Sequence, residues 1–122
     1  MKILALGGSG GMGRFAVSTS MNFENVSEII VADINADSAV TFANSMNEKV
    51  SGIGLDVTDI DGLKRQMEKV DVVINTVGPF YKFGPPILEA AIDVGCHYLD
   101  INDDWEPTVE MLKLHKKAED NS

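Results

Sequence analysis

Short apolar runs alternate along the chain with longer stretches in which apolar residues recur at helical spacing. Each run has the length of a strand, and the fourth is apolar throughout its centre, which is typical of strands that helices cover on both faces. The pattern therefore predicts strands and helices in alternation. The predicted strands cover residues 3–6, 29–32, 49–55, 71–77 and 97–101.

The stretches between these runs predict the helices. Thr58 and Asp61 have the spacing of a capping box in front of the third helix. Pro85–Pro86 is expected to open the fourth helix, because the first turn needs no amide donor, and Gly95 is expected to end it. One final helix is predicted to follow Pro107.

Strands that alternate with helices imply right-handed crossovers and a parallel, doubly wound sheet. The predicted fold is therefore α/β of the Rossmann type, with about five strands in the order 3-2-1-4-5 and helices on both faces. The 122 residues, 44% of them hydrophobic, are expected to form one dinucleotide-binding domain. Because the full fold has a sixth strand, we expect the chain to be part of a larger, two-domain enzyme.

A glycine-rich segment, GGSGGMG at residues 7–13, joins the first strand to the first helix. In its G-x-G-x-x-G spacing, Gly8 permits a tight turn, Gly10 admits backbone amides close to a phosphate, and Gly13 lets the helix pack closely. The helix N-terminus then faces the negative charge of a pyrophosphate. The predicted pyrophosphate-binding residues are Gly8, Ser9, Gly10, Gly11, Met12 and Gly13.

Asp33 ends the second apolar run, about 20 residues beyond the last glycine, where a dinucleotide fold has the acid that binds the adenosine ribose. A 2′-phosphate ~4 Å from this carboxylate would meet a repulsion on the order of 4 kcal/mol at an effective dielectric of ~20. The next residues, 34–36, carry no Arg or Lys. NAD is therefore the predicted cofactor, and NADP is left open because the acid can rotate away.

Composition limits the partners. Ten Lys and Arg stand against 19 Asp and Glu, a formal charge of −9, so we do not expect nucleic acid to bind. No apolar run approaches the ~20 residues that cross a bilayer, so no membrane contact is expected.

Cys96 is the only cysteine and Met1-Lys2 leads directly into a strand, which favours a cytoplasmic location. No metal site or catalytic triad is predicted around His97 or His115.

Several segments in the second half carry a family likeness. They are residues 75–80 (NTVGPF), Gly84-Pro85, Ala90-Ala91 and residues 95–101 (GCHYLDI). Together they resemble the N-terminal domain of the saccharopine dehydrogenase-like family. In that family a nicotinamide-binding domain precedes a substrate domain, and hydride transfer forms or cleaves secondary amines through an imine. The resemblance implies a nicotinamide cofactor and an amino-acid-like or polyamine-like substrate, with this chain inactive on its own.

The resemblance also implies roles by position. The segment after the fourth strand would contact the ribose and nicotinamide half of the cofactor. Its residues are Thr76, Val77, Gly78, Pro79 and Phe80. Asp56 and Val57 would lie near the adenine, with a turn or cap as the alternative for Asp56. For Pro79 and Phe80 the alternative is a loop that packs on the edge of the sheet.

Tyr81 and Asp100 are the candidate catalytic residues, because they are the polar residues nearest the expected nicotinamide end. Either could assist proton transfer or orient a substrate ammonium group. The alternatives are packing for Tyr81 and the binding of backbone donors for Asp100. Asp103, Asp104 and Glu106 form an acidic cluster that would attract a cationic substrate or face solvent.

Two other functions fit the same motif. One is a non-enzymatic sensor or regulatory domain that binds the dinucleotide without turnover. The other is an atypical short-chain dehydrogenase, because Gly7, Gly11 and Gly13 also have the G-x-x-x-G-x-G spacing of those enzymes. The glycines alone do not distinguish these functions, and a homodimer is left open.

Overall fold

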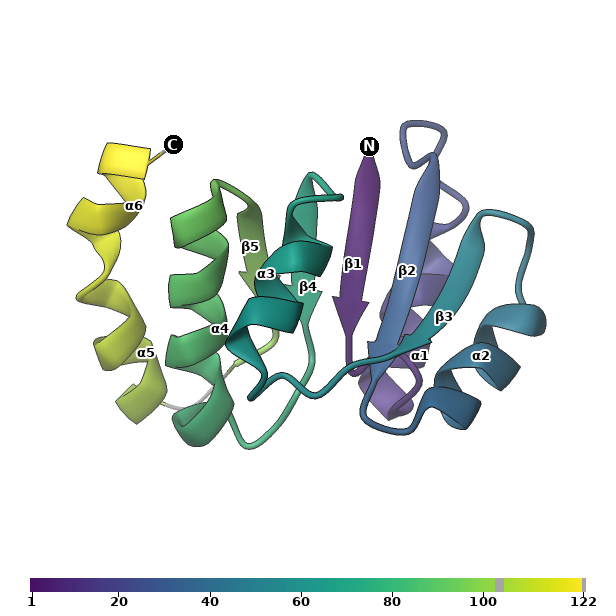
Figure 1. Cartoon of the computed structure of the whole chain (residues 1–122), viewed down its shortest axis with the longest axis horizontal. Coiled ribbons are helices and arrows are strands. Elements are labelled where there is room, and N and C mark those ends of the chain that lie inside the picture. Colours follow the sequence, from purple (N-terminus) through teal and green to yellow (C-terminus); the bar gives the residue numbers. More distant parts are fainter. Residues whose placement is uncertain (103–104, 122) are drawn as a thin grey trace.

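The computed structural model describes residues 1–102 and 105–121, in which five parallel strands form one sheet (Figure 1). The strands are β1 (Lys2–Leu6), β2 (Glu28–Asp33), β3 (Val50–Gly54), β4 (Val72–Asn75) and β5 (His97–Asp100). The helices are α1 (Gly11–Ser20), α2 (Ala36–Asn44), α3 (Ile60–Met67), α4 (Phe80–Val94), α5 (Trp105–Leu112) and α6 (His115–Asn121). The order β3-β2-β1-β4-β5 confirms the predicted topology.

Side chains of the central strand β1 alternate between the two faces of the sheet. Ile3 and Ala5 belong to the buried cluster that α1 and α2 cover, whereas Leu4 and Leu6 belong to the cluster beneath α3 and α4. Because neighbouring residues of a strand point to opposite faces, a strand covered on both sides must be apolar throughout. The predicted placement of helices on both faces is confirmed, with α3 and α4 in front of the sheet in Figure 1 and α1 behind it.

The carboxyl ends of the strands meet at one edge of the sheet. Leu6 pairs with Ala32 in β2 and with Asn75 in β4, and Asn75 pairs with Asp100 in β5. The turns that follow these strands therefore lie at the same edge, toward which the arrows point in Figure 1. In open α/β sheets this is the edge at which ligands bind.

Helix α4 begins at Phe80, so the prediction that it opens at Pro85–Pro86 is wrong, and Phe80 and Tyr81 lie in a helix rather than a loop. The two prolines stand inside the helix, where they cannot donate to the carbonyl groups of Tyr81 and Lys82. Both of those residues are exposed, so water can satisfy the carbonyl groups and the helix continues through the prolines.

The start of α3 also differs from the prediction. Asp59 caps this helix, and its Oδ1 accepts a hydrogen bond of 3.2 Å from the amide of Gly62. Thr58, the predicted cap, instead donates from its amide and its hydroxyl group to Oδ1 of Asp56. The carboxylate that follows Thr58 thus replaces it at the helix start.

The C-terminal segment forms two short helices instead of the single helix predicted after Pro107. Helix α5 begins at Trp105, and the amide of Leu114 bonds the carbonyl of Met111 where the first helix ends. Helix α6 then packs on α4, where Lys117 lies 2.7 Å from Asp93. Gly95 ends α4 in the left-handed conformation, with φ of +76°, as predicted.

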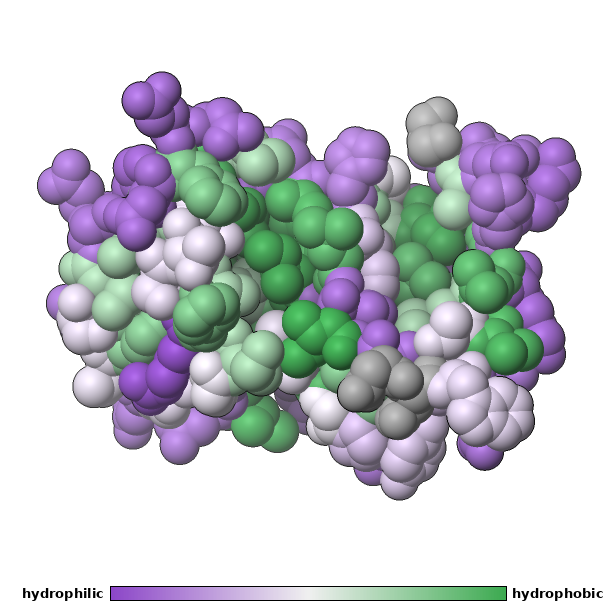
Figure 2. All heavy atoms as spheres, turned by 180° about the vertical axis from the view of Figure 1, so that it is seen from behind, coloured by the Kyte–Doolittle hydropathy of each residue, from purple (hydrophilic) through white to green (hydrophobic). Residues whose placement is uncertain are grey.

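The face of the sheet that carries α1 is only partly covered. Ile74 packs against the cluster under α1 and α2, and its partner Leu99 in β5 therefore faces the same side. Leu99 is 60% exposed, because α1 and α2 lie over β1, β2 and β3. Viewed from behind, apolar residues accordingly gather in the middle of the molecule (Figure 2).

Candidate functional site

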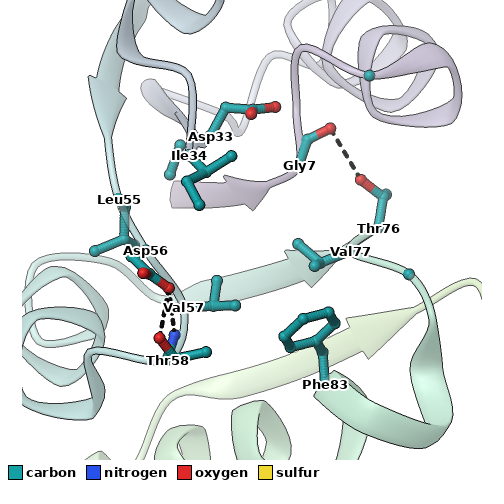
Figure 3. Close-up of a pocket in the computed structure, with 13 residues that line it drawn as sticks. Gly7, Asp33, Ile34, Leu55, Asp56, Val57, Thr58, Thr76, Val77 and Phe83 are labelled. Atoms are coloured by element: carbon teal, nitrogen blue, oxygen red, sulfur yellow. Dashed lines mark hydrogen bonds between the residues drawn. The ribbon is translucent and has the colours of Figure 1, made fainter.

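A cavity of about 510 Å³ lies at the carboxyl edge of the sheet. It opens between the turns that follow four strands, β1, β2, β3 and β4 (Figure 3). Its lining residues are Gly7, Gly10, Ala32, Asp33, Ile34, Leu55, Asp56, Val57, Thr58, Thr76, Val77, Gly78 and Phe83. Segments far apart in the sequence thus form one mostly apolar hollow with a few polar groups, as small-molecule sites commonly do.

The glycine turn after β1 forms one wall of this cavity. Gly7 has a φ of +71°, so the tight turn depends on Gly7, whereas the sequence assigned it to Gly8. A Cβ on Gly8 would press on Ala5 and Val31 of the sheet. A Cβ on Gly13 would overlap the carbonyl group of Gly7, so helix α1 can approach the turn this closely only with glycine there.

The N-terminus of α1 is suited to an anion. Its N-cap is Gly10, and the helix, which is described throughout, has no side-chain cap and no acidic residue in its first turn. The first amides of an α-helix lack intrahelical partners, and the helix dipole is positive at this end. Gly10 lines the cavity, whereas Gly11 and Met12 are exposed beside it and Ser9 is buried.

Asp33 lies at the end of β2 and is held by two donors. Ser9 donates its hydroxyl to Oδ2 at 2.6 Å, and the amide of Asn35 donates to Oδ1 at 3.2 Å. The hydroxyl of Ser38 in turn donates to that of Ser9 at 3.2 Å. These bonds fix the carboxylate next to the glycine turn, at the rim of the cavity, and leave it further lone pairs for a ligand.

Arg14 is the cation that directly follows the glycine turn. Its Nε donates to the carbonyl of Ser9, and its guanidinium lies 4.7 Å from the centre of the Phe42 ring in α2. Both contacts draw the side chain toward α2, on the side of the turn where Ser9 binds Asp33.

The turn after β3 brings Asp56, Val57 and Thr58 into the cavity wall. Thr58 donates from its hydroxyl group at 2.7 Å and from its amide at 2.9 Å to Oδ1 of Asp56, and these bonds lower the pKa of that carboxyl. Asp56 is therefore ionised at neutral pH, and these hydrogen bonds form a turn, which was one of the alternative roles expected for it. It also faces the same hollow as Asp33, across from it in Figure 3.

Thr76 connects the segment after β4 to the glycine turn. Its hydroxyl lies within hydrogen-bond distance of two carbonyl groups, Leu6 at 2.8 Å and Gly7 at 3.1 Å (Figure 3). Val77 and Gly78 follow it in the cavity wall. Pro79 and Phe80 are not among the residues of this wall; Pro79 caps α4 and Phe80 begins it.

The two candidate catalytic residues do not reach the cavity. Tyr81 is 69% exposed in the first turn of α4 and lies by Trp105 and Glu106 instead. Asp100 accepts hydrogen bonds from the hydroxyl of Tyr98 at 2.8 Å and from the amide of Asn102 at 3.1 Å. The amide of Asn102 is a backbone donor of the kind that the alternative for Asp100 expected, whereas the hydroxyl of Tyr98 is a side-chain donor. Of the acidic cluster, Asp103 and Asp104 lie outside the described residues, and Glu106 is exposed in α5.

Six residues of the cavity wall were not predicted. They are Gly7, Ala32, Ile34, Leu55, Thr58 and Phe83. Ile34 and Leu55 directly follow β2 and β3, so their position after a strand was the available signal. Phe83 lies one turn into α4, and its place depends on the early start of that helix.

The described part of the chain shows neither a metal-binding group nor a membrane-spanning helix. There, no group of three or more His, Cys, Asp or Glu side chains is placed to hold a metal ion. None of the helices found there combines the length and the apolar character that a membrane-spanning segment needs.

Comparison with known proteins identifies the family. A family model described as the saccharopine dehydrogenase NADP binding domain matches residues 3–122. The chain belongs to this family. The predicted resemblance is thereby confirmed over almost the whole length, and the saccharopine dehydrogenase family takes precedence over the short-chain dehydrogenases that the glycine spacing also allowed.

Relatives of this saccharopine dehydrogenase-type domain include much longer proteins. One from Arabidopsis thaliana, described as a "probable mitochondrial saccharopine dehydrogenase-like oxidoreductase", is 28% identical over 97% of the chain and 29% of its own length. An uncharacterised membrane protein from Methanocaldococcus jannaschii is 36% identical over 68% of the chain and 26% of its own length. The chain thus spans between a quarter and a third of these relatives.

Solved structures support the fold of the saccharopine dehydrogenase-type domain. The apo form of histidine-tagged saccharopine dehydrogenase (L-Glu forming) from Saccharomyces cerevisiae superimposes with a TM-score of 0.80. It shares 23% sequence identity, and the match covers 95% of this chain and 24% of the yeast protein. At that identity the likeness establishes the fold alone.

Proposed function

We propose that this domain binds a nicotinamide dinucleotide along the carboxyl edge of its sheet. The amides at the start of α1 would hold the pyrophosphate, Asp33 the adenosine ribose, and the turn at residues 55–58 the adenine. The nicotinamide half would lie by Val77 and Phe83. The observation that carries this proposal is the single cavity of about 510 Å³ that joins the glycine turn, Asp33 and the turns after β3 and β4.

In the whole protein, we propose, the domain serves an oxidoreductase that transfers a hydride to or from an imine or secondary amine of an amino-acid-like or polyamine-like substrate. Membership of the family and the description of the Arabidopsis relative as an oxidoreductase support this. The candidate catalytic residues lie away from the cavity, which supports the expectation that the isolated chain has no turnover. A substrate domain, a homodimer and a cytoplasmic location stay predictions. The description of the Arabidopsis relative names a different location, the mitochondrion.

Two observations bear on the choice between NAD and NADP, and they favour different cofactors. The description of the family model names NADP. Asp33, however, lines the cavity, and its carboxylate would repel a 2′-phosphate. We propose NAD as the preferred cofactor on the strength of this local chemistry.

A charge placed at Gly11 tests where the pyrophosphate binds. A Cβ here would meet no atom within 4 Å, and an acid in the first turn of a helix favours folding. At ~6 Å and an effective dielectric of ~40, repulsion between one carboxylate and one phosphate charge is on the order of 1.4 kcal/mol, or about tenfold in Kd. Calorimetry should therefore show that Gly11→Asp binds NADH about tenfold more weakly while its melting temperature does not fall.

Gly11→Asn is the matched control, because it adds a side chain of the same shape without the charge. It should bind NADH nearly as the unaltered domain does. If the two variants bound NADH equally, the pyrophosphate could not lie at this helix end, and a domain that bound neither NADH nor NADPH would contradict the proposed function as a whole.

A further inference from the structure

A buried amide stands between the cofactor cavity and the last strand. Asn75, at the end of β4, is fully buried, yet both ends of its side chain have partners. Its Oδ1 accepts from the amide of Val77 at 2.9 Å, and its Nδ2 donates to the hydroxyl oxygen of Tyr98 at 3.0 Å. Val77 lines the cavity, so Asn75 connects the cavity wall to β5.

The carboxylate of Asp100 determines which group donates and which accepts in each of these hydrogen bonds. A carboxylate only accepts, so the hydroxyl of Tyr98 must donate to Oδ2 of Asp100, at 2.8 Å. The hydroxyl oxygen is then left to accept, and Asn75 must present its Nδ2 to it. Only in that orientation does Oδ1 of Asn75 face the amide of Val77.

We propose that Asp100 and Tyr98 are positioning residues, which act through Asn75 to hold the backbone of Val77 in the wall of the cofactor site. The importance of Val77 for a ligand rests on the proposed function. The hydrogen bonds themselves do not. The same segment is held on its other side by Thr76, which bonds the end of β1 and the glycine turn.

The surroundings of Tyr98 and Asp100 fit positioning better than proton transfer. Burial of Tyr98 raises the pKa of its hydroxyl, and so does the neighbouring Asp100, so the donor keeps its proton throughout the neutral range. Asp100 lies outside the cavity wall, and its other oxygen, Oδ1, already accepts from the amide of Asn102. The carboxylate therefore acts on the site through Tyr98 and Asn75 rather than by contact.

Three variants separate the parts of this chain of hydrogen bonds. Tyr98→Phe removes the hydroxyl, Asp100→Leu removes the acceptor, and Asp100→Asn keeps an acceptor oxygen in the same place. Amide hydrogen exchange at Val77, measured by NMR, reports the loop directly, and titration with NADH reports the site. Tyr98→Phe and Asp100→Leu should each speed exchange at Val77 and weaken NADH binding about fivefold, which is typical for one neutral hydrogen bond. Asp100→Asn should restore both values.

Two controls keep this result apart from general destabilisation. Exchange at buried amides of β1, such as Leu4, should not change in the three variants. Asp120→Leu, an acid-to-leucine change on the exposed face of α6, should leave Val77 exchange and NADH binding as they are.

Unaltered exchange at Val77 in Tyr98→Phe would overturn the inference, as would a failure of Asp100→Asn to restore it. If the unaltered domain did not bind NADH at all, the proposed cofactor site would fall, and Val77 exchange alone would decide whether these residues position the loop.

Discussion

Asp33 has one role in the fold and another in the proposed site, and its position in the sequence indicated only the second. It ends β2 with its carboxylate bonded to Ser9 and to the amide of Asn35, and it lines the cavity. The first role fixes the glycine turn to the second strand. The second sets a negative charge where the proposed ribose would lie, so the residue that shapes the turn would also disfavour a 2′-phosphate in the proposed function.

Replacing Asp33 should change which cofactor is preferred. In Asp33→Ala, NADH should bind about tenfold more weakly, because hydrogen bonds from the ribose to a charged group are lost. NADPH should lose less, because the repulsion of its 2′-phosphate disappears as well. Calorimetry with both cofactors measures the ratio of their Kd values, which should move toward NADPH.

Asp33→Asn is the control for charge, since it keeps an acceptor for Ser9 and for the ribose. It should shift the ratio in the same direction with a smaller loss of NADH binding. A ratio of Kd values that stayed the same in both variants would contradict this explanation of cofactor choice.

Only some residues of the cavity wall could be predicted from the sequence. The glycine motif and Asp33 were recognisable because their spacing is set by a strand, a turn and a helix that are adjacent in the chain. Ile34 and Leu55 carry only the weaker signal of directly following a strand, and Phe83 lies within a helix and carries no such signal. Their place in one cavity wall follows from the pairing of β1 with β2 and β4 and of β2 with β3.

At the scale of elements, apolar runs predicted all five strands, with ends within a few residues of those found. Helix starts were predicted less well, because they depend on single hydrogen bonds and on exposure. Pro85 and Pro86 read as a helix start, yet the carbonyl groups they leave unbonded belong to exposed residues, and α4 begins earlier. Thr58 read as a cap, yet Asp59 takes that role.

The start of α3 gives a test at this scale. Asp59→Ala removes the side chain that accepts from the amide of Gly62, and should lower the free energy of unfolding by about 1 kcal/mol, the usual cost of losing an N-cap. Asp61→Ala, in the first turn of the same helix, should cost only about 0.3–1 kcal/mol through the helix dipole. Urea unfolding of both variants measures the difference, and a larger loss in Asp61→Ala would contradict the assignment of the cap.

At the scale of the whole molecule, the turns of the proposed site lie at one edge of the sheet, and ion pairs join helices to one another away from it. Asp93 of α4 contacts Lys64 of α3 at 3.1 Å and Lys117 of α6 at 2.7 Å. It therefore joins three helices through one carboxylate. No spacing rule indicated this, because the three residues come from different helices.

These contacts predict a dependence of stability on pH. Hydrogen bonds from Lys117 and then Lys64 lower the pKa of Asp93 below its ordinary 3.8. A carboxyl whose pKa is lower in the folded state stabilises the fold above its ordinary pKa, and this contribution is lost as the pH falls through the folded-state value. The difference in free energy of unfolding between the unaltered domain and Asp93→Asn should thus be largest near neutral pH and shrink below about pH 4.

Urea unfolding across this pH range measures that difference. Asp120→Asn is the control, because its carboxylate meets Lys116 at 3.4 Å on the exposed face of α6 and should contribute little. A difference for Asp93→Asn that stayed constant from pH 7 to about pH 3 would show that the ion pairs do not stabilise the fold.

The proposed function places a nicotinamide dinucleotide along the carboxyl edge of the sheet, with its pyrophosphate on the glycine turn. NMR titration of the ¹⁵N-labelled domain with NADH locates the bound dinucleotide, because each amide reports its own surroundings. We expect the largest shifts at Gly10 to Gly13, Ile34 and Val77. Shifts that left these amides unmoved and gathered instead around Tyr81 and Trp105 would contradict it.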